Sequence, residues 1–131
     1  MKKKLLASTL CAVGLLASAS MASAGTSAIP YATELPVLSN NIYLASGKKA
    51  DTTKSRVENS LVGSTYTANM WIVDANGKKV SATATDVTDG DNRNFTVDAS
   101  AVGGSVSLAA ENANATYVKV DIAGNFYPDT K

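Results

Sequence analysis

The chain of 131 residues contains no histidine and only one cysteine, Cys11. Without histidine there is no Ser-His-Asp or Cys-His nucleophile and no histidine-based zinc site. The sequence also has no Walker loop, and Gly103-Gly104 is not followed by a helical pattern that would bring backbone N–H groups to a phosphate. These absences exclude the commonest catalytic sites, and we expect a protein that is not an enzyme.

The N-terminal segment has the pattern of a helical signal peptide. Residues 2–4 are lysines, residues 5–16 form an apolar run, and Ala22 and Ala24 supply the small-x-small pattern that signal peptidase recognises. We therefore expect cleavage before Gly25 and a secreted, extracellular product, free or associated with the cell wall. The apolar run is shorter than the about 20 residues of a membrane span, which disfavours an anchor.

Removal of this leader would take away three of the 12 basic residues and none of the 11 acidic ones, so the remaining net charge is 9 − 11 = −2. A chain without a basic patch is not expected to bind nucleic acid or an anionic membrane. Cys11 leaves with the leader, and Leu10 before it does not fit the lipidation pattern. The exported chain would therefore fold by burial of apolar groups, without disulfides.

A strand-turn-strand pattern in residues 66–84 organises the rest of the chain. Side-chain polarity alternates over residues 66–73 and again over 80–84, and Asn76-Gly77 between them accepts the positive φ angles of a hairpin. Similar alternating runs, separated by Asp, Asn and Gly, recur about every 10–12 residues. Six or seven such strands predict an all-β fold, either a small antiparallel β-sandwich of Ig-like size or a small barrel.

The domain boundaries follow from the same pattern. We expect a signal peptide over residues 1–24, an extended and flexible lead-in over residues 25–38 that contains two prolines, and a single β-sandwich domain over residues 39–131. Charged residues at every second position of residues 54–58 are typical of an edge strand. The expected core consists of the inward-facing residues Met70, Ile72, Val80, Phe95, Val97, Val106, Leu108, Val118, Val120 and Ile122.

Acidic residues offer two kinds of site. A pair of carboxylates would suffice for a glycosidase-like hydrolase, but most of the acidic residues fall in turns, where Asp hydrogen-bonds its own backbone. Asp86, Asp89 and Asp91 form the densest cluster of oxygen ligands and are the candidate calcium site. Their spacing does not fit an EF-hand, and a solvated turn is the competing interpretation. No other cofactor is expected.

Trp71 is the sharpest candidate for a binding surface. If its two neighbours in the chain face the core, alternation places Trp71 on the opposite face together with Thr67 and Asn69. An indole beside hydroxyl and amide groups suits stacking on a sugar or packing against a protein partner. Coverage of Trp71 by a neighbouring segment is the alternative. Tyr127 is a second aromatic candidate for this contact surface.

The strand of residues 69–73 with its Asn-Gly turn, the acidic and amide turn in residues 108–114, and the closing pair Phe126 and Tyr127 resemble a family of small exported proteins of unknown function from bacilli. The resemblance covers residues 64–127. It implies export and a β-rich domain, and it brings no activity with it. A weaker likeness is to lactococcin-type bacteriocins, which are short, exported, cysteine-free β-sandwich proteins.

Three hypotheses for the function follow. The first is a secreted, non-catalytic β-sandwich module with a binding or structural role, whose partner is an extracellular protein or a wall glycan. The second is a bacteriocin-like antagonistic protein or its accessory factor. The third is a carboxylate-based hydrolase, which a close pair of acids in a cleft would support.

Overall fold

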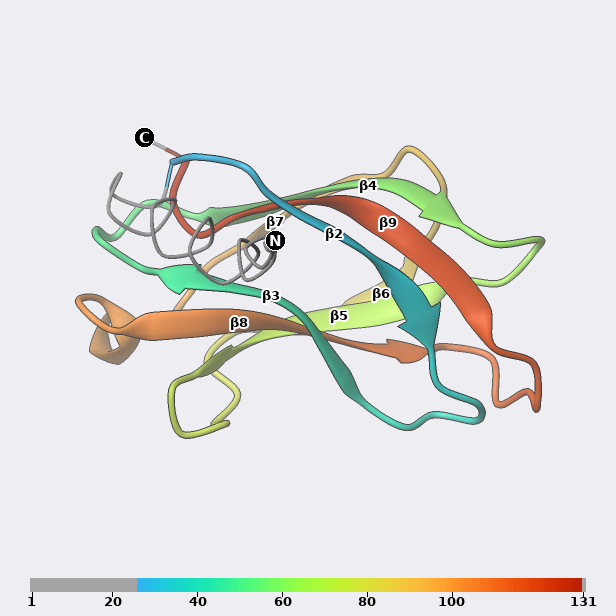
Figure 1. Ribbon diagram of the computed structural model, residues 1–131. Coiled ribbons are helices and arrows are strands. Elements are labelled where there is room, and N and C mark those ends of the chain that lie inside the picture. The colour runs from blue at the N-terminus through green and yellow to red at the C-terminus, as the bar shows by residue number, and fades with distance from the viewer. Residues whose placement is uncertain (1–25, 131) are drawn as a thin grey trace, which may run out of the picture.

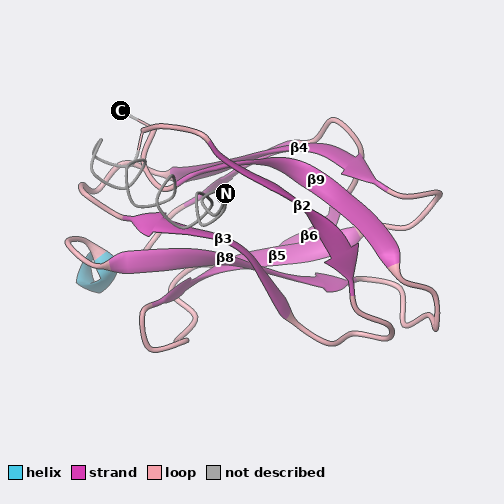
Figure 2. Cartoon of the chain, in the orientation of Figure 1, coloured by secondary structure: helices cyan, strands magenta, loops and turns pink. Residues whose placement is uncertain are grey.

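The computed structural model describes residues 26–130. In it, two antiparallel β-sheets pack face to face (Figure 1). The strand order is β2-β9-β4-β7 in one sheet and β3-β8-β5-β6 in the other. The expected all-β antiparallel sandwich is thus confirmed. The strands are β2 (Ile29–Leu35), β3 (Ile42–Lys48), β4 (Ser55–Val62), β5 (Ala68–Asp74), β6 (Ala84–Val87), β7 (Asn92–Phe95), β8 (Ser105–Asn112) and β9 (Val120–Tyr127), with the 3₁₀ turn η1 (Ala99–Ala101) before β8 (Figure 2).

The description begins at residue 26. The expected signal peptide and its cleavage site at Ala22, Ala24 and Gly25 lie outside the described residues. Within residues 26–130 we find no helix that is both long and apolar enough to cross a membrane.

The structure differs from the sequence prediction at the lead-in expected over residues 25–38. Part of this segment is β2, which pairs with β9 from Ile29 opposite Phe126 to Leu35 opposite Val120. β2 is an edge strand with a single neighbour, which is where a proline can be accommodated in a sheet. The buried side chain of Leu35 holds the segment on the sheet. β2 therefore adds an eighth strand to the six or seven expected.

β4 lies inside its sheet, between β9 and β7, and is not the edge strand that its alternating charges predicted. The alternation itself is correct, because Ser55 and Val57 are buried while Arg56 and Glu58 are partly exposed. The two charged side chains pair with each other, with 2.5 Å between Arg56 Nη2 and Glu58 Oε2. Local pattern thus gave the face of each side chain, whereas the position of the strand depends on partners distant in sequence.

The core lies between the sheets and contains most of the residues expected there. Val118 is an exception and is 51% exposed, because β9 begins only at Val120. Val97 is partly buried and packs against the core. The remaining expected residues are buried: Met70, Ile72, Val80, Phe95, Val106, Leu108, Val120 and Ile122. In addition to the expected residues, the core contains Tyr31, Leu35, Val57, Val62 and Phe126.

The hairpin expected in residues 66–84 is present, but its second strand is interrupted. The backbone N–H of Asp74 donates to Lys78 O at 2.8 Å, and Gly77 has a φ of 83°, which a Cβ would disfavour. The returning chain then stops pairing with β5 through its backbone. The N–H of Ile72 donates instead to the side-chain hydroxyl Ser81 Oγ, at 2.9 Å. Pairing with β5 resumes at β6.

Gly124 on β9 provides a test of how tightly the sheet packs around its central strand. A Cβ at this position would lie 2.6 Å from Tyr31 Oη and 2.9 Å from Asn59 Cα, and it would also meet the carbonyl oxygen of Glu58. We expect Gly124→Ala to destabilise the protein by about 1–3 kcal/mol, since neighbouring backbone has to move. Thermal and urea unfolding measure this loss.

Gly104→Ala is the matched control. Its Cβ would meet nothing closer than Ala101 O at 3.7 Å, which is ordinary van der Waals contact. If Gly124→Ala were as stable as Gly104→Ala, the close approach of β9 to β2 and β4 described here would be wrong.

Candidate functional site

The outer face of the β3-β8-β5-β6 sheet carries Trp71, as the alternation predicted. Trp71 lies opposite Ala109 of β8, and Ala109 lies opposite Tyr43 of β3, so the three residues form one row across the sheet. Tyr43 is 57% exposed and Trp71 is half-buried. Ala109 between them is fully buried although it lies outside the core cluster. The row is therefore a small surface in which two aromatic rings flank an alanine, and we call it the aromatic row.

The loop of the β5–β6 hairpin lies against one side of the aromatic row. A Cβ at Gly77 would be 3.4 Å from Tyr43 Oη, which places the loop next to the tyrosine. Lys79 Nζ lies 5.7 Å from the centre of the Trp71 ring, a cation–π contact. Val73, which shares the outer face with Trp71, is buried. The indole ring of Trp71 is therefore partly exposed to solvent and partly covered by the loop.

Polar side chains continue this face beyond the aromatic row. Asn69 Nδ2 donates to Glu111 Oε2 at 3.1 Å, and Asn69 Oδ1 accepts the backbone N–H of Asp86 at 3.2 Å. Thr67 Oγ1 donates to Asp86 Oδ1 at 3.1 Å. Thr67, Asn69 and Trp71 therefore share one face as expected, and the amide and hydroxyl are held in place by neighbours on β6 and β8.

Tyr127 does not join this surface. It belongs to β9 in the opposite sheet, where its hydroxyl donates to Glu58 Oε1 at 3.1 Å and the Arg56 guanidinium lies 5.0 Å from its ring centre. Desolvation first, and the adjacent Glu58 carboxylate second, raise the pKa of Tyr127. The sequence could not show this separation, because it depends on which sheet each strand joins.

The three acids of the candidate calcium site are not brought together. Asp86 binds Thr67, Asp89 Oδ1 accepts the backbone N–H of Val62 at 2.5 Å, and Asp91 Oδ2 accepts from Arg93 Nη2 at 3.2 Å. Among the described residues, no group of three or more acidic side chains could hold a metal ion. Each carboxylate instead fixes a separate piece of backbone or a neighbouring side chain.

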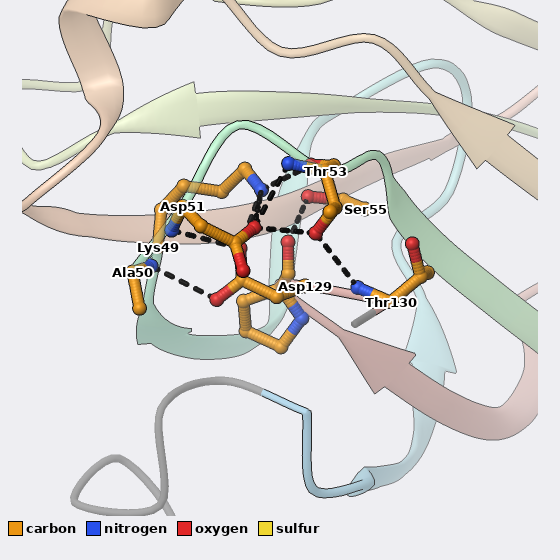
Figure 3. Close-up of polar contacts among 8 residues, drawn as sticks. Lys49, Ala50, Asp51, Thr53, Ser55, Asp129 and Thr130 are labelled. Atoms are coloured by element: carbon orange, nitrogen blue, oxygen red, sulfur yellow. Dashed lines mark hydrogen bonds and ion pairs between the residues drawn. The ribbon is translucent and has the colours of Figure 1, made fainter.

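A second polar cluster, which the sequence did not indicate, lies where the ends of β3 and β9 meet (Figure 3). Lys49 follows β3, Asp129 follows β9, and both side chains are buried, with exposed fractions of 1% and 0%. Lys49 Nζ is 2.5 Å from Asp129 Oδ1 and also donates to Thr53 O. Asp51 lies beside them, with its Oδ1 4.0 Å from Lys49 Nζ. The Asp51 side chain is 43% exposed, so the cluster is only partly buried, and we call Lys49, Asp51 and Asp129 the lysine–aspartate triad.

Backbone groups complete the surroundings of Asp129. Ala50 N–H donates to Asp129 Oδ2 at 2.9 Å, and Asp51 N–H donates to Asp129 Oδ1 at 3.4 Å. The segment that carries Asp129 is held on both sides, because Ser55 Oγ donates to Pro128 O at 2.6 Å and Thr130 N–H donates to Thr53 Oγ1 at 3.2 Å. In the sequence these residues look like solvent-exposed polar ends of strands, and only the pairing of distant strands buries them.

Two pockets in the described part of the chain lack the pair of acids that a carboxylate-based hydrolase would need. One, of about 330 Å³, lies between β6 and β7 and has no acidic residue in its lining. The other, of about 120 Å³, is lined by Asp129 with Arg56 and Tyr127 and is smaller than the roughly 300–1,000 Å³ of ligand pockets. Asp51 and Asp129 both face Lys49, with Oδ1 atoms 4.0 Å and 2.5 Å from its Nζ.

Comparison of the chain with models of protein families, with curated proteins and with solved structures finds no match in any of the three. The fold and the two clusters are therefore interpreted from the geometry alone. The resemblance to a small exported family stays a prediction from the sequence.

Asp51 provides a test of the electrostatics of the lysine–aspartate triad. Hydrogen bonds from the Thr53 hydroxyl and the Thr53 N–H lower the pKa of Asp51 below its ordinary value of 3.8. The ionised carboxylate therefore stabilises the fold above pH 3.8, and this contribution is lost as the pH falls through the lower folded-state pKa. We expect Asp51→Asn to be less stable than wild type at neutral pH, with a difference in Tm that shrinks in strong acid.

The control is Asp98→Asn, because Asp98 is exposed and makes no side-chain hydrogen bond to the turn that follows it. This variant should show little change in Tm at any pH. A difference between Asp51→Asn and wild type that does not depend on pH would contradict the assignment of a stabilising carboxylate.

Proposed function

We propose that the chain is an exported, non-catalytic β-sandwich module that binds a wall glycan through the outer face of the β3-β8-β5-β6 sheet. The observation that carries this proposal is the aromatic row, in which Trp71 and Tyr43 flank a buried alanine on a rigid sheet. Export is supported by the leader pattern of the first residues.

The spacing of the aromatic row suits an extended chain of sugars. Two strand spacings separate Trp71 from Tyr43, which amounts to about 10 Å between their backbones. Aromatic faces bind the apolar faces of sugar rings, and neighbouring amide and carboxylate groups bind their hydroxyls. Asn69 and Glu111, hydrogen-bonded to each other, provide such groups two residues further along the same two strands.

Rigidity also supports the proposal. Strand pairing on both sides of β8 and the burial of Ala109 and Val73 fix the backbone under the rings. A binding face that is already ordered loses little conformational entropy when it binds. An extracellular protein is the alternative partner for the same face.

Retention on insoluble wall material tests the proposal. We expect the wild-type chain to sediment with peptidoglycan or wall polysaccharide, and Trp71→Ala to bind at least about tenfold more weakly, because a stacked aromatic ring at the centre of an interface typically contributes more than about 1.4 kcal/mol. Tyr43→Ala should weaken binding as well.

The matched control is Tyr117→Ala. Tyr117 is 83% exposed but lies in the loop between β8 and β9, outside the strands that carry the aromatic row. Equal retention of Trp71→Ala and wild type on the wall material would show that Trp71 does not contact the glycan. Failure of the wild type to bind any wall preparation would overturn the glycan as the partner.

A further inference from the structure

Lys49 and Asp129 have the arrangement of two groups that can react with each other. Lys49 Nζ is 2.5 Å from Asp129 Oδ1, closer than the about 2.7–2.9 Å of an ordinary charge-assisted hydrogen bond. Both side chains are removed from solvent. The carbon of the Asp129 carboxyl group lies one bond beyond the oxygen that the amine already contacts.

We propose that Lys49 and Asp129 condense, once the chain has folded, into an amide bond between their side chains. The product would be a covalent link between the end of β3 in one sheet and the segment after β9 in the other. The inference does not depend on the aromatic row or on any ligand.

The reaction starts from the neutral forms of both groups, an amine and a carboxylic acid, which differ from the ion pair by the position of one proton. The short contact between Lys49 Nζ and Asp129 Oδ1 gives this proton a direct path. The result is a neutral amine, which is a nucleophile, next to a neutral carboxylic acid, which is an electrophile.

The backbone is placed to stabilise the negative charge that develops on Asp129. Ala50 N–H donates to Oδ2 at 2.9 Å and Asp51 N–H lies 3.4 Å from Oδ1. Oδ2 is the oxygen that stays on Cγ and carries the negative charge when the amine adds, so the Ala50 N–H acts as a single-donor oxyanion hole. The Asp51 N–H is directed at Oδ1, the oxygen that departs.

The step balances without any oxidant or cofactor. The lone pair of Lys49 Nζ forms a bond to Asp129 Cγ, and the Cγ–Oδ1 bond breaks. The nitrogen releases one proton to Asp51, whose Oδ1 is 4.0 Å from it, and Asp51 passes this proton to the departing hydroxyl. The products are one amide and one water, and Asp51 is returned to its starting state.

Such a bond would give the domain a covalent cross-link, which it cannot form with disulfides because residues 39–131 contain no cysteine. It would close a loop between residues 80 positions apart in sequence and would fasten the two sheets to each other. Cross-links of this kind stabilise a fold mainly by restricting the unfolded chain, and more so for longer loops.

Mass spectrometry of the denatured full chain tests the proposal. We expect a mass lower than that of the sequence by one water molecule, with the N-terminus read from the same sample. Trypsin should fail to cleave after Lys49 and should release residues 49–54 joined to residues 120–131. Lys49→Arg and Asp129→Ala should have the full mass of their sequences. Asp51→Asn should form the link more slowly during refolding.

The measured mass of the wild-type chain decides whether the amide forms. A wild-type chain with its full mass, or a loss of water that maps to the Asp89-Gly90 turn, would overturn the proposal, and this holds even if a variant fails to fold. A wild-type rate of link formation in Asp51→Asn would overturn the proton transfer assigned to Asp51.

Discussion

The contact between Lys49 and Asp129 is the interaction on which the rest of the sandwich depends. It is buried, it joins the end of a strand in one sheet to the segment after a strand in the other, and the hydrogen bonds of Ser55 and Thr53 hold that segment from both sides. β9 lies between β2 and β4, so fixing the segment that follows it also fixes the register of its sheet. In a domain without disulfides, this polar cluster takes the place of a covalent staple, and the proposed amide would make it one.

The two sheets present different outer faces. The β2-β9-β4-β7 sheet carries Arg56, Glu58 and Tyr127, which contact one another through an ion pair, a hydrogen bond and a cation–π contact. The β3-β8-β5-β6 sheet carries the aromatic row, where Tyr43 has no hydrogen bond from its hydroxyl to another described residue and is largely exposed. The exposed aromatic ring of Tyr43 beside Trp71 is why the second sheet is the better candidate for a binding surface.

Local alternation was sufficient to predict the fold class, the β5–β6 turn at Gly77 and most of the core. It failed where pairing over long distances decides the outcome. Pro30 and Pro36 predicted a lead-in where β2 forms, and the alternation of β9 extends backwards past its true start, which wrongly predicted Val118 in the core. Lys49 and Asp129 each have the sequence pattern of a solvated strand end, and only the meeting of the ends of β3 and β9 buries them.

Hydrogen exchange of the backbone amides in the native protein tests most directly whether this cluster fastens the sandwich. The amides of Ala50, Asp51 and Thr130, which donate to Asp129 or Thr53, should exchange as slowly as those at the centres of β4 and β9, that is, only through global unfolding. Exchange of these amides at the rate of a frayed chain end, while the central strands stay protected, would contradict the interpretation.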